Sequence, residues 1–264
     1  MTTTFSFSRL LQLIRKQWIE NARLYLFSVL ALLGLLALIL TFWVTTSGPY
    51  YREDVTFIIF IAGLFISGSV FAGFSFNMLS DKAKGTYWLG FPASHIEKLM
   101  CMIFYSLIVY TLVYCACFFL LKWLAVAYIR QLVAREPGVY SFHEIDWADP
   151  NGFRQVFQVL MYGYVAIQSF YLLGSAYFSR YAFVLTTVAG AAIVFLFVML
   201  MISLATNAFP DGFSWNGLYV RDFKSQRDYE LSPWLTDVIA FSAKFIWAPV
   251  FWMAAWFRLK EKQI

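Results

Sequence analysis

Histidine is scarce in this sequence, and that scarcity excludes several kinds of membrane chemistry. The two histidines, His95 and His143, both fall between long apolar runs. A haem held within a membrane needs axial ligands at membrane depth, usually histidines, so a b-type cytochrome is excluded. An intramembrane serine protease would also need an embedded histidine. No cluster of Cys, His and carboxylate residues has metal-ligand spacing at membrane depth, so we expect no metal site.

Acidic residues are missing from the interior of every long apolar run, and Asp237 lies near the start of the last one. Ion-coupled transporters usually place carboxylates near the bilayer midplane. Their absence disfavours that class, and it also disfavours an intramembrane aspartyl protease. The phosphate-binding pattern Gly-x-x-x-x-Gly-Lys-Ser/Thr is absent as well. We therefore expect no enzymatic activity and no cofactor, and any uphill transport must draw its energy from another subunit.

Apolar residues are abundant instead: 61% of the 264 residues are hydrophobic, 21% are aromatic and 13% are charged. Soluble domains carry about 25% charged residues. Windows of about 20 apolar residues recur along the whole length, as in helices that span a membrane. Inside lipid, backbone N–H and C=O groups must be hydrogen-bonded within the protein, and helices achieve this without closing a barrel. We expect an all-α, polytopic membrane protein with about six spans, near residues 24–46, 55–79, 99–128, 157–179, 181–205 and 234–257.

The basic residues predict the orientation of these spans. On the side of the N-terminus there are eleven: Arg9, Arg15, Lys16, Arg23, Lys82, Lys84, Lys98, Arg180, Arg258, Lys260 and Lys262. The opposite side has seven, mixed with acidic residues: Arg52, Arg130, Arg135, Arg154, Arg221, Lys224 and Arg227. Cytoplasmic segments carry the excess of Lys and Arg, so both termini are expected in the cytoplasm. The net charge of +5 thus reflects orientation, and we expect no nucleic-acid partner.

The chain divides into an amphipathic segment, residues 1–23, and a transmembrane domain, residues 24–264. Phe7, Leu10, Leu11, Ile14 and Trp18 recur at three- and four-residue spacing, which predicts a helix over 5–23 lying in the inner membrane interface, in contact with lipid. It could be a simple anchor or a docking surface for a cytoplasmic partner. Two outer segments, residues 130–156 and 206–233, exceed ordinary loop length and should carry structure of their own. Their aromatics could rest among the headgroups or form a small outer cap.

The inner loop over residues 80–98 contains the most informative phrase of the chain, Phe91-Pro92-Ala93-Ser94-His95-Ile96-Glu97-Lys98. Pro92 ends the preceding segment because it lacks a backbone N–H. Ser94 followed three residues later by Glu97 forms a capping box, which predicts that a helix begins at Ser94 and runs into the apolar stretch from Leu99.

Lys244 and several small residues raise separate questions inside the spans. Lys244 falls about ten residues into the last predicted span, and an intramembrane lysine is by default a functional hypothesis. It could line a substrate path, snorkel to the surface, or pair with Asp237. Small residues predict close helix packing within the bundle, or else a subunit interface: Gly63, Ser67, Gly68, Ala72 and Gly73 in one run, and Gly163, Ala166, Gly174 and Ser175 in another.

The layout and two short motifs resemble permeases of the type-2 ABC export class. The stretch from Gly90 to Leu99 is similar to the Leu-Pro-x-Ser-x-x-Glu-Lys phrase common in Bacteroidota members, with Phe91 where leucine is usual. Residues 169–174, Ser-Phe-Tyr-Leu-Leu-Gly, resemble a Ser-x-x-x-Leu-Gly stretch of the same permeases. The layout covers nearly the whole chain, whereas the close motif covers about ten residues.

The resemblance implies a multi-pass permease subunit in a bacterial inner membrane. Two copies, or two related permeases, would pair with two separate ABC ATPase subunits that bind and hydrolyse ATP. The inner loop 80–98 would couple to the ATPase through these residues: Asp81, Lys82, Lys84, Pro92, Ser94, Glu97 and Lys98. A membrane scaffold subunit of a larger envelope, secretion or motility complex is the alternative function. A channel is disfavoured because no span has a clear polar stripe.

Overall fold

The computed structural model describes residues 5–80, 82–145, 153–178, 180–208, 213–216, 219–222, 228–230 and 232–261. Its helices are α1 (Phe7–Thr46), α2 (Glu53–Phe74), α3 (Lys82–Leu89), α4 (His95–Ile103), α5 (Tyr110–Arg135), α6 (Phe153–Tyr177), α7 (Ala182–Ala208), α8 (Pro233–Phe245) and α9 (Trp247–Glu261), with a 3-10 turn η1 (Asn77–Ser80) and a π-helical turn η2 (Phe104–Val109). The strands are β1 (Tyr50–Arg52), β2 (Ser141–His143), β3 (Phe213–Asn216), β4 (Tyr219–Asp222) and β5 (Asp228–Glu230).

Among the described residues, five helical segments are long and apolar enough to cross a membrane: Phe7–Thr46, Glu53–Phe74, His95–Arg135, Arg154–Tyr177 and Ala182–Ser203. They coincide with the first five expected spans. The third combines α4, η2 and α5 into 41 continuous residues, which is about 60 Å of helix at 1.5 Å per residue. The protein is therefore predominantly helical and membrane-embedded.

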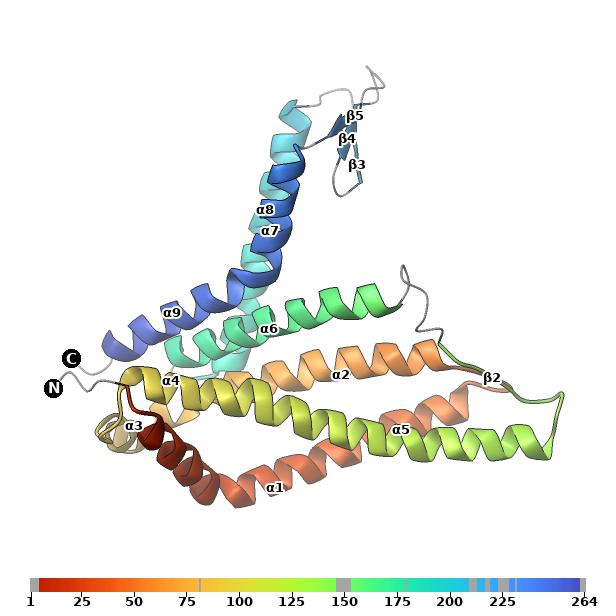
Figure 1. The fold of residues 1–264 in the computed structure, drawn as a ribbon, viewed down its shortest axis with the longest axis horizontal. Helices are drawn as coiled ribbons and strands as arrows, with labels where there is room; N and C mark the ends of the chain where they lie inside the picture. Colours follow the sequence, from red (N-terminus) through yellow and green to blue (C-terminus); the bar gives the residue numbers. More distant parts are fainter. Residues whose placement is uncertain are drawn as a thin grey trace.

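The sixth expected span, 234–257, is not one straight helix. Its residues form α8 and α9, which meet at Ile246 and run in different directions (Figure 1). Pro249 explains the break, because proline has no N–H to donate to the carbonyl of Phe245 and its ring clashes with that carbonyl. The continuous run of apolar residues therefore predicted one straight span, although Pro249 changes the direction of the helix within it.

Helices α1, α2, α5 and α6 run side by side along one axis, and α9 packs against α6 (Figure 1). The first and last described residues lie at one end of this bundle, together with α3 and the start of α4; we call this the terminal end. At the other end, the β end, β1 pairs in parallel with β2, and Tyr51 lies opposite Phe142. The backbone N–H of Ser141 extends the pairing by donating to the carbonyl of Pro49 at 2.9 Å.

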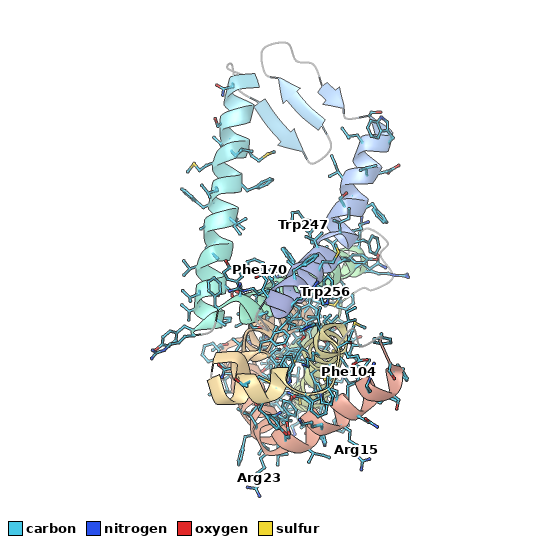
Figure 2. All side chains as sticks on the ribbon, turned by 90° about the vertical axis from the view of Figure 1, so that its left-hand side faces the viewer. Arg15, Arg23, Phe104, Phe170, Trp247 and Trp256 are labelled. Atoms are coloured by element: carbon cyan, nitrogen blue, oxygen red, sulfur yellow. The ribbon has the colours of Figure 1, made fainter. Side chains whose placement is uncertain are left out.

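Helices α7 and α8 leave the bundle at a steep angle and carry the antiparallel sheet β3–β4–β5 at their far end (Figure 1). Near the base of this arm, Phe170 of α6 packs against Phe251 of α9, with ring centroids 5.4 Å apart, and against Gly190 of α7 (Figure 2). Beyond Gly190, every residue of α7 from Ala191 to Leu200 is exposed. The arm therefore joins the bundle at its base and presents an apolar surface beyond it.

The expected amphipathic helix is continuous with the first span in α1, and Figure 1 shows that α1 bends sharply between its amino-terminal part and the rest. The amide of Asn21 donates to the carbonyl of Gln17 at 3.1 Å, and side chains that bond back to the helix in this way favour bending. Arg15 and Arg23 point away from the bundle (Figure 2). The predicted segment 5–23 thus forms the amino-terminal part of α1, and its place in the membrane interface stays a prediction.

Four of the small residues provide close helix contacts inside the bundle. A methyl group at Gly63 would overlap Tyr114, one at Gly68 would overlap Gln168, and one at Gly174 would overlap Thr186. At Gly73 a methyl carbon would lie 3.1 Å from Cβ of Phe183. Gly163 differs, because nothing lies within 4 Å of a methyl group placed there. Internal packing, the first of the two expected uses, accounts for these four glycines.

Candidate functional site

The capping box at the start of α4 is present in both directions. The hydroxyl of Ser94 accepts a hydrogen bond from the backbone N–H of Glu97 at 3.2 Å, and Oε2 of Glu97 accepts one from the backbone N–H of Ser94 at 2.8 Å. Ser94 has the extended backbone of an N-cap residue, with φ −67° and ψ 156°. The helix start that the local sequence predicted is therefore confirmed.

Glu97 also contacts a second helix, and no local sequence pattern predicts this contact. Its Oε1 accepts a hydrogen bond from the backbone N–H of Ser6, the N-cap residue of α1, at 2.7 Å, and lies 3.2 Å from the guanidinium of Arg9. The side chain of Glu97 is completely buried. One carboxylate thus binds the N-cap backbone of both α1 and α4, where negative charge is favoured by both helix dipoles.

Three further contacts from the bundle helices strengthen the tie between α1 and the inner loop. The ammonium group of Lys16 lies 3.9 Å from the ring centroid of Phe91 and 4.5 Å from that of Tyr87. The hydroxyl of Tyr105, in η2, donates to the carbonyl of Ile14 at 2.7 Å. Cation–π contacts and buried hydrogen bonds of this kind each contribute on the order of 1 kcal/mol. The amino-terminal half of α1 and the residues 87–105 therefore form one packed unit, which we call the terminal-end clamp.

Lys98 does not present its charge at the surface. Its side chain is 1% exposed, and the ammonium nitrogen lies 5.5 Å from the ring centroid of the buried Trp88 of α3. Lys98 therefore packs α3 against α4. Its part in coupling to an ATPase subunit stays a prediction.

The other expected coupling residues lie in different situations. Pro92 is exposed in the turn between α3 and α4, where Ala93 donates its N–H to the carbonyl of Phe91 at 2.7 Å. Lys82 and Lys84 are positions of α3, and Asp81 lies outside the described residues. The exposed apolar residues of this segment are Tyr87, at 65% exposure, and Ile96, at 46%. Sequence reasoning missed these two because it searched for charge.

Lys244 is exposed in the last turn of α8, and the described residues include no ion-pair partner for it. A lysine in a last turn is favoured by the helix dipole, which offers one physical reason for its position. Lys244 lies at the base of the arm, next to Phe245, whose ring packs against that of Tyr162 of α6 with centroids 5.2 Å apart. A place for Lys244 in a substrate path stays a prediction.

Buried hydroxyl groups join α2, α5 and α6 in the bundle interior. Tyr110 donates to the hydroxyl of Ser67 at 2.5 Å, and the hydroxyls of Thr111 and Tyr164 lie 3.0 Å apart. Gln168 is 98% buried beside Gly68, and neither of its amide atoms has a hydrogen-bond partner among the described residues. Interhelical hydrogen bonds of this kind stabilise packing in lipid, so this cluster holds the three helices together.

The β end contains charged pairs. Glu53, the first residue of α2, pairs with Lys122 of α5, and its other oxygen accepts the backbone N–H of Ile145 at 3.0 Å. Arg130 and Glu144 pair at 2.8 Å. The ion pair of Lys122 with Glu53 ties α5 to the start of α2.

A groove of about 950 Å³ lies beside these pairs, between α1 and α5. Its walls include Leu40 and Val44 from α1, Ala125 from α5, and Tyr51 and Tyr140 from the loops at the β end. Burial, with Tyr140 and Tyr128 nearby, raises the pKa of Tyr51 above its ordinary value. The groove is therefore neutral, apolar along the helices and lined by tyrosines at the β end.

The comparisons with known proteins give no match: none was found among family models, curated proteins or solved structures.

Proposed function

We propose that this chain is the membrane-spanning permease subunit of an ATP-driven exporter. A separate ABC ATPase subunit would bind the terminal end of the bundle at residues 80–98, and a second copy or a related permease would complete the transporter. The observation that carries this proposal is the terminal-end clamp, in which Glu97 binds the N-cap residues Ser6 and Ser94 of two helices at once. The turn between α3 and α4, which exposes Pro92, leads directly into the spanning helix His95–Arg135.

Such a clamp suits the transmission of a displacement from a soluble partner. A load on Pro92 and Ile96 would reach α4 through a capped helix start, and α1 through the carboxylate of Glu97. From α4 the helix continues through η2 into α5 without a break in the chain of helical residues. A π-helical turn is a common feature of functional sites, and here it begins within the clamp, at Phe104.

The source of energy agrees with a separate ATPase. The sequence has no phosphate-binding Gly-x-x-x-x-Gly-Lys-Ser/Thr pattern. The described carboxylates of the bundle lie at its ends, Glu97 at the terminal end and Glu53 at the β end, instead of midway as in an ion relay. In this proposal the terminal end faces the cytoplasm of a bacterial cell, because the excess of Lys and Arg flanks it.

A membrane scaffold subunit is the second candidate, and the exposed arm favours it. Helix α7 exposes large apolar side chains around its full circumference beyond Gly190, among them Phe195 at 59% and Phe197 at 61%. A helix that is apolar on all sides is covered by lipid or by other membrane helices. A scaffold would use this surface to hold several membrane proteins, whereas a permease would use it for its second copy.

The first test is purification of the chain from its native membranes in a mild detergent, with identification of its partners by mass spectrometry. We expect a stoichiometric nucleotide-binding subunit that is lost when the exposed residues Tyr87, Pro92 and Ile96 are replaced by aspartate. The matched control carries aspartate at three exposed positions of the β end, Tyr50, Val139 and Ser141, and should retain the subunit. Recovery of membrane proteins alone would reject the permease and favour the scaffold.

A further inference from the structure

The groove between α1 and α5 straddles the boundary between the apolar and polar parts of the bundle. The ion pair between Glu53 and Lys122 marks this boundary, because a buried charge pair is far cheaper at a membrane interface than in the hydrocarbon. Leu121, which precedes Lys122, lies in the groove wall. On α1 the wall runs from Ala37 to Thr45, about 12 Å towards the membrane interior at 1.5 Å per residue.

The two ends of the groove differ in chemistry. Ala37 and Leu40 line the end that lies within the first apolar span, and Leu121 is the lining residue of α5 that precedes the boundary at Lys122. The end beyond the boundary is formed by Gly48, Pro49 and Tyr140. Gly48 has a left-handed backbone, with φ +61°, which lets the chain turn from α1 into β1 and close this end. An occupant must therefore be apolar at one end and polar at the other.

From this gradient we propose that the groove binds one membrane phospholipid, with an acyl chain between α1 and α5 and the glycerol and headgroup region against Tyr51, Tyr128 and Tyr140. Its volume of about 950 Å³ lies in the upper part of the usual range for ligand sites, about 300–1,000 Å³. Tyrosine suits the position, since its ring is apolar and its hydroxyl can donate to a phosphate or ester oxygen. No charged residue among those described lines the groove, and the β-end charges Arg52 and Arg130 are paired with Asp54 and Glu144, which favours a zwitterionic over an anionic headgroup.

The proposal depends on residence in a membrane and not on transport, so its outcome is separate from that of the permease proposal. The test reconstitutes the full chain in phosphatidylcholine vesicles that contain a small fraction of phosphatidylcholine with a photoreactive diazirine on one acyl chain. After irradiation, peptide mass spectrometry maps the cross-linked residues. We expect cross-links concentrated on Leu121, in the groove wall, relative to Leu112, which is exposed on α5 outside the groove.

Two substitutions fill the groove from opposite walls, Ala125→Trp on α5 and Ala37→Trp on α1. Each should lower the yield of groove cross-links several-fold. The controls, Leu120→Trp and Leu38→Trp, lie on the same helices at exposed positions outside the groove and should leave the yield unchanged. Each groove variant is a complete test by itself if it purifies as a monodisperse, folded protein. Misfolding of one variant therefore still leaves the other to test the proposal. Uniform labelling of exposed positions, or equal yields in all four variants, would show ordinary surrounding lipid and overturn the proposal.

Discussion

The carboxylate of Glu97, in the first turn of α4, accepts the backbone N–H of Ser6, the residue at which α1 begins. The same side chain accepts the backbone N–H of Ser94 and faces the guanidinium of Arg9. A carboxylate with no exposed surface is stable only when its oxygens are bonded and its charge is paired. Glu97 meets both conditions, and it does so by fastening the start of the first spanning helix to the start of the third.

Replacing Glu97 by alanine should detach α1 from α4. The change leaves two N-cap N–H groups without this acceptor and removes the ion-pair partner of Arg9, so we expect a loss on the order of 1–3 kcal/mol. Thermal unfolding in detergent measures the loss. Glu20→Ala is the control, because Glu20 is 46% exposed and its pairing with Lys16 at 3.7 Å is a surface contact. Equal effects of the two substitutions would contradict the role given to Glu97.

Replacing Ser94 by alanine removes one half of the capping box and should cost about 1 kcal/mol of helix stability. If the permease proposal holds, membrane insertion remains normal while substrate-dependent ATP hydrolysis by the copurified complex falls. Ser28→Ala is the matched control, since the hydroxyl of Ser28 bonds only to the carbonyl of Leu24 within α1 and is exposed. Unchanged coupled ATP turnover in the Ser94 variant would remove the capping box from the coupling mechanism.

Two glycine-to-alanine substitutions in spanning helices should have opposite effects. At Gly68 the new methyl group overlaps the buried amide of Gln168, so we expect destabilisation by about 1–3 kcal/mol through overpacking. At Gly163 the space is open, and alanine should be neutral or stabilise the helix by up to about 1 kcal/mol. The thermal unfolding temperatures of the two purified variants, compared with that of the unsubstituted protein, measure both effects. A neutral Gly68 variant would mean that α2 and α6 are not packed as described.

Replacing Pro249 by alanine should straighten the junction between α8 and α9. The substitution restores an N–H that can donate to the carbonyl of Phe245 and removes the ring that clashes with it. Spin labels on the exposed positions Val238 and Phe257, in a background without the three native cysteines, should move apart in a pulsed electron resonance measurement. A label pair on α7, at Val184 and Ile193, should keep its distance. An unchanged distance between α8 and α9 would assign the break to another cause.

Local features of the sequence determined much of this protein. Runs of apolar residues located the first five spanning helices, because hydropathy depends on composition over about 20 residues. The capping box followed from Ser94 and Glu97, since both partners lie within one helical turn. The break at Pro249 was missed, because the run 234–257 was predicted as one span from hydropathy, although proline alone removes a bond to the carbonyl four positions earlier.

The tertiary structure alone decided which distant groups meet. The second helix bound by Glu97, the burial of Lys98 against Trp88, and the pairing of Lys122 with Glu53 all join segments far apart in the sequence. The same holds for the glycines, because the lack of space at Gly68 and the open space at Gly163 depend on what the neighbouring helix places there. A short-range pattern fixes which residues are helical, since those hydrogen bonds are local. Which faces of the helices touch, and where a groove remains between them, depends on packing of the whole bundle.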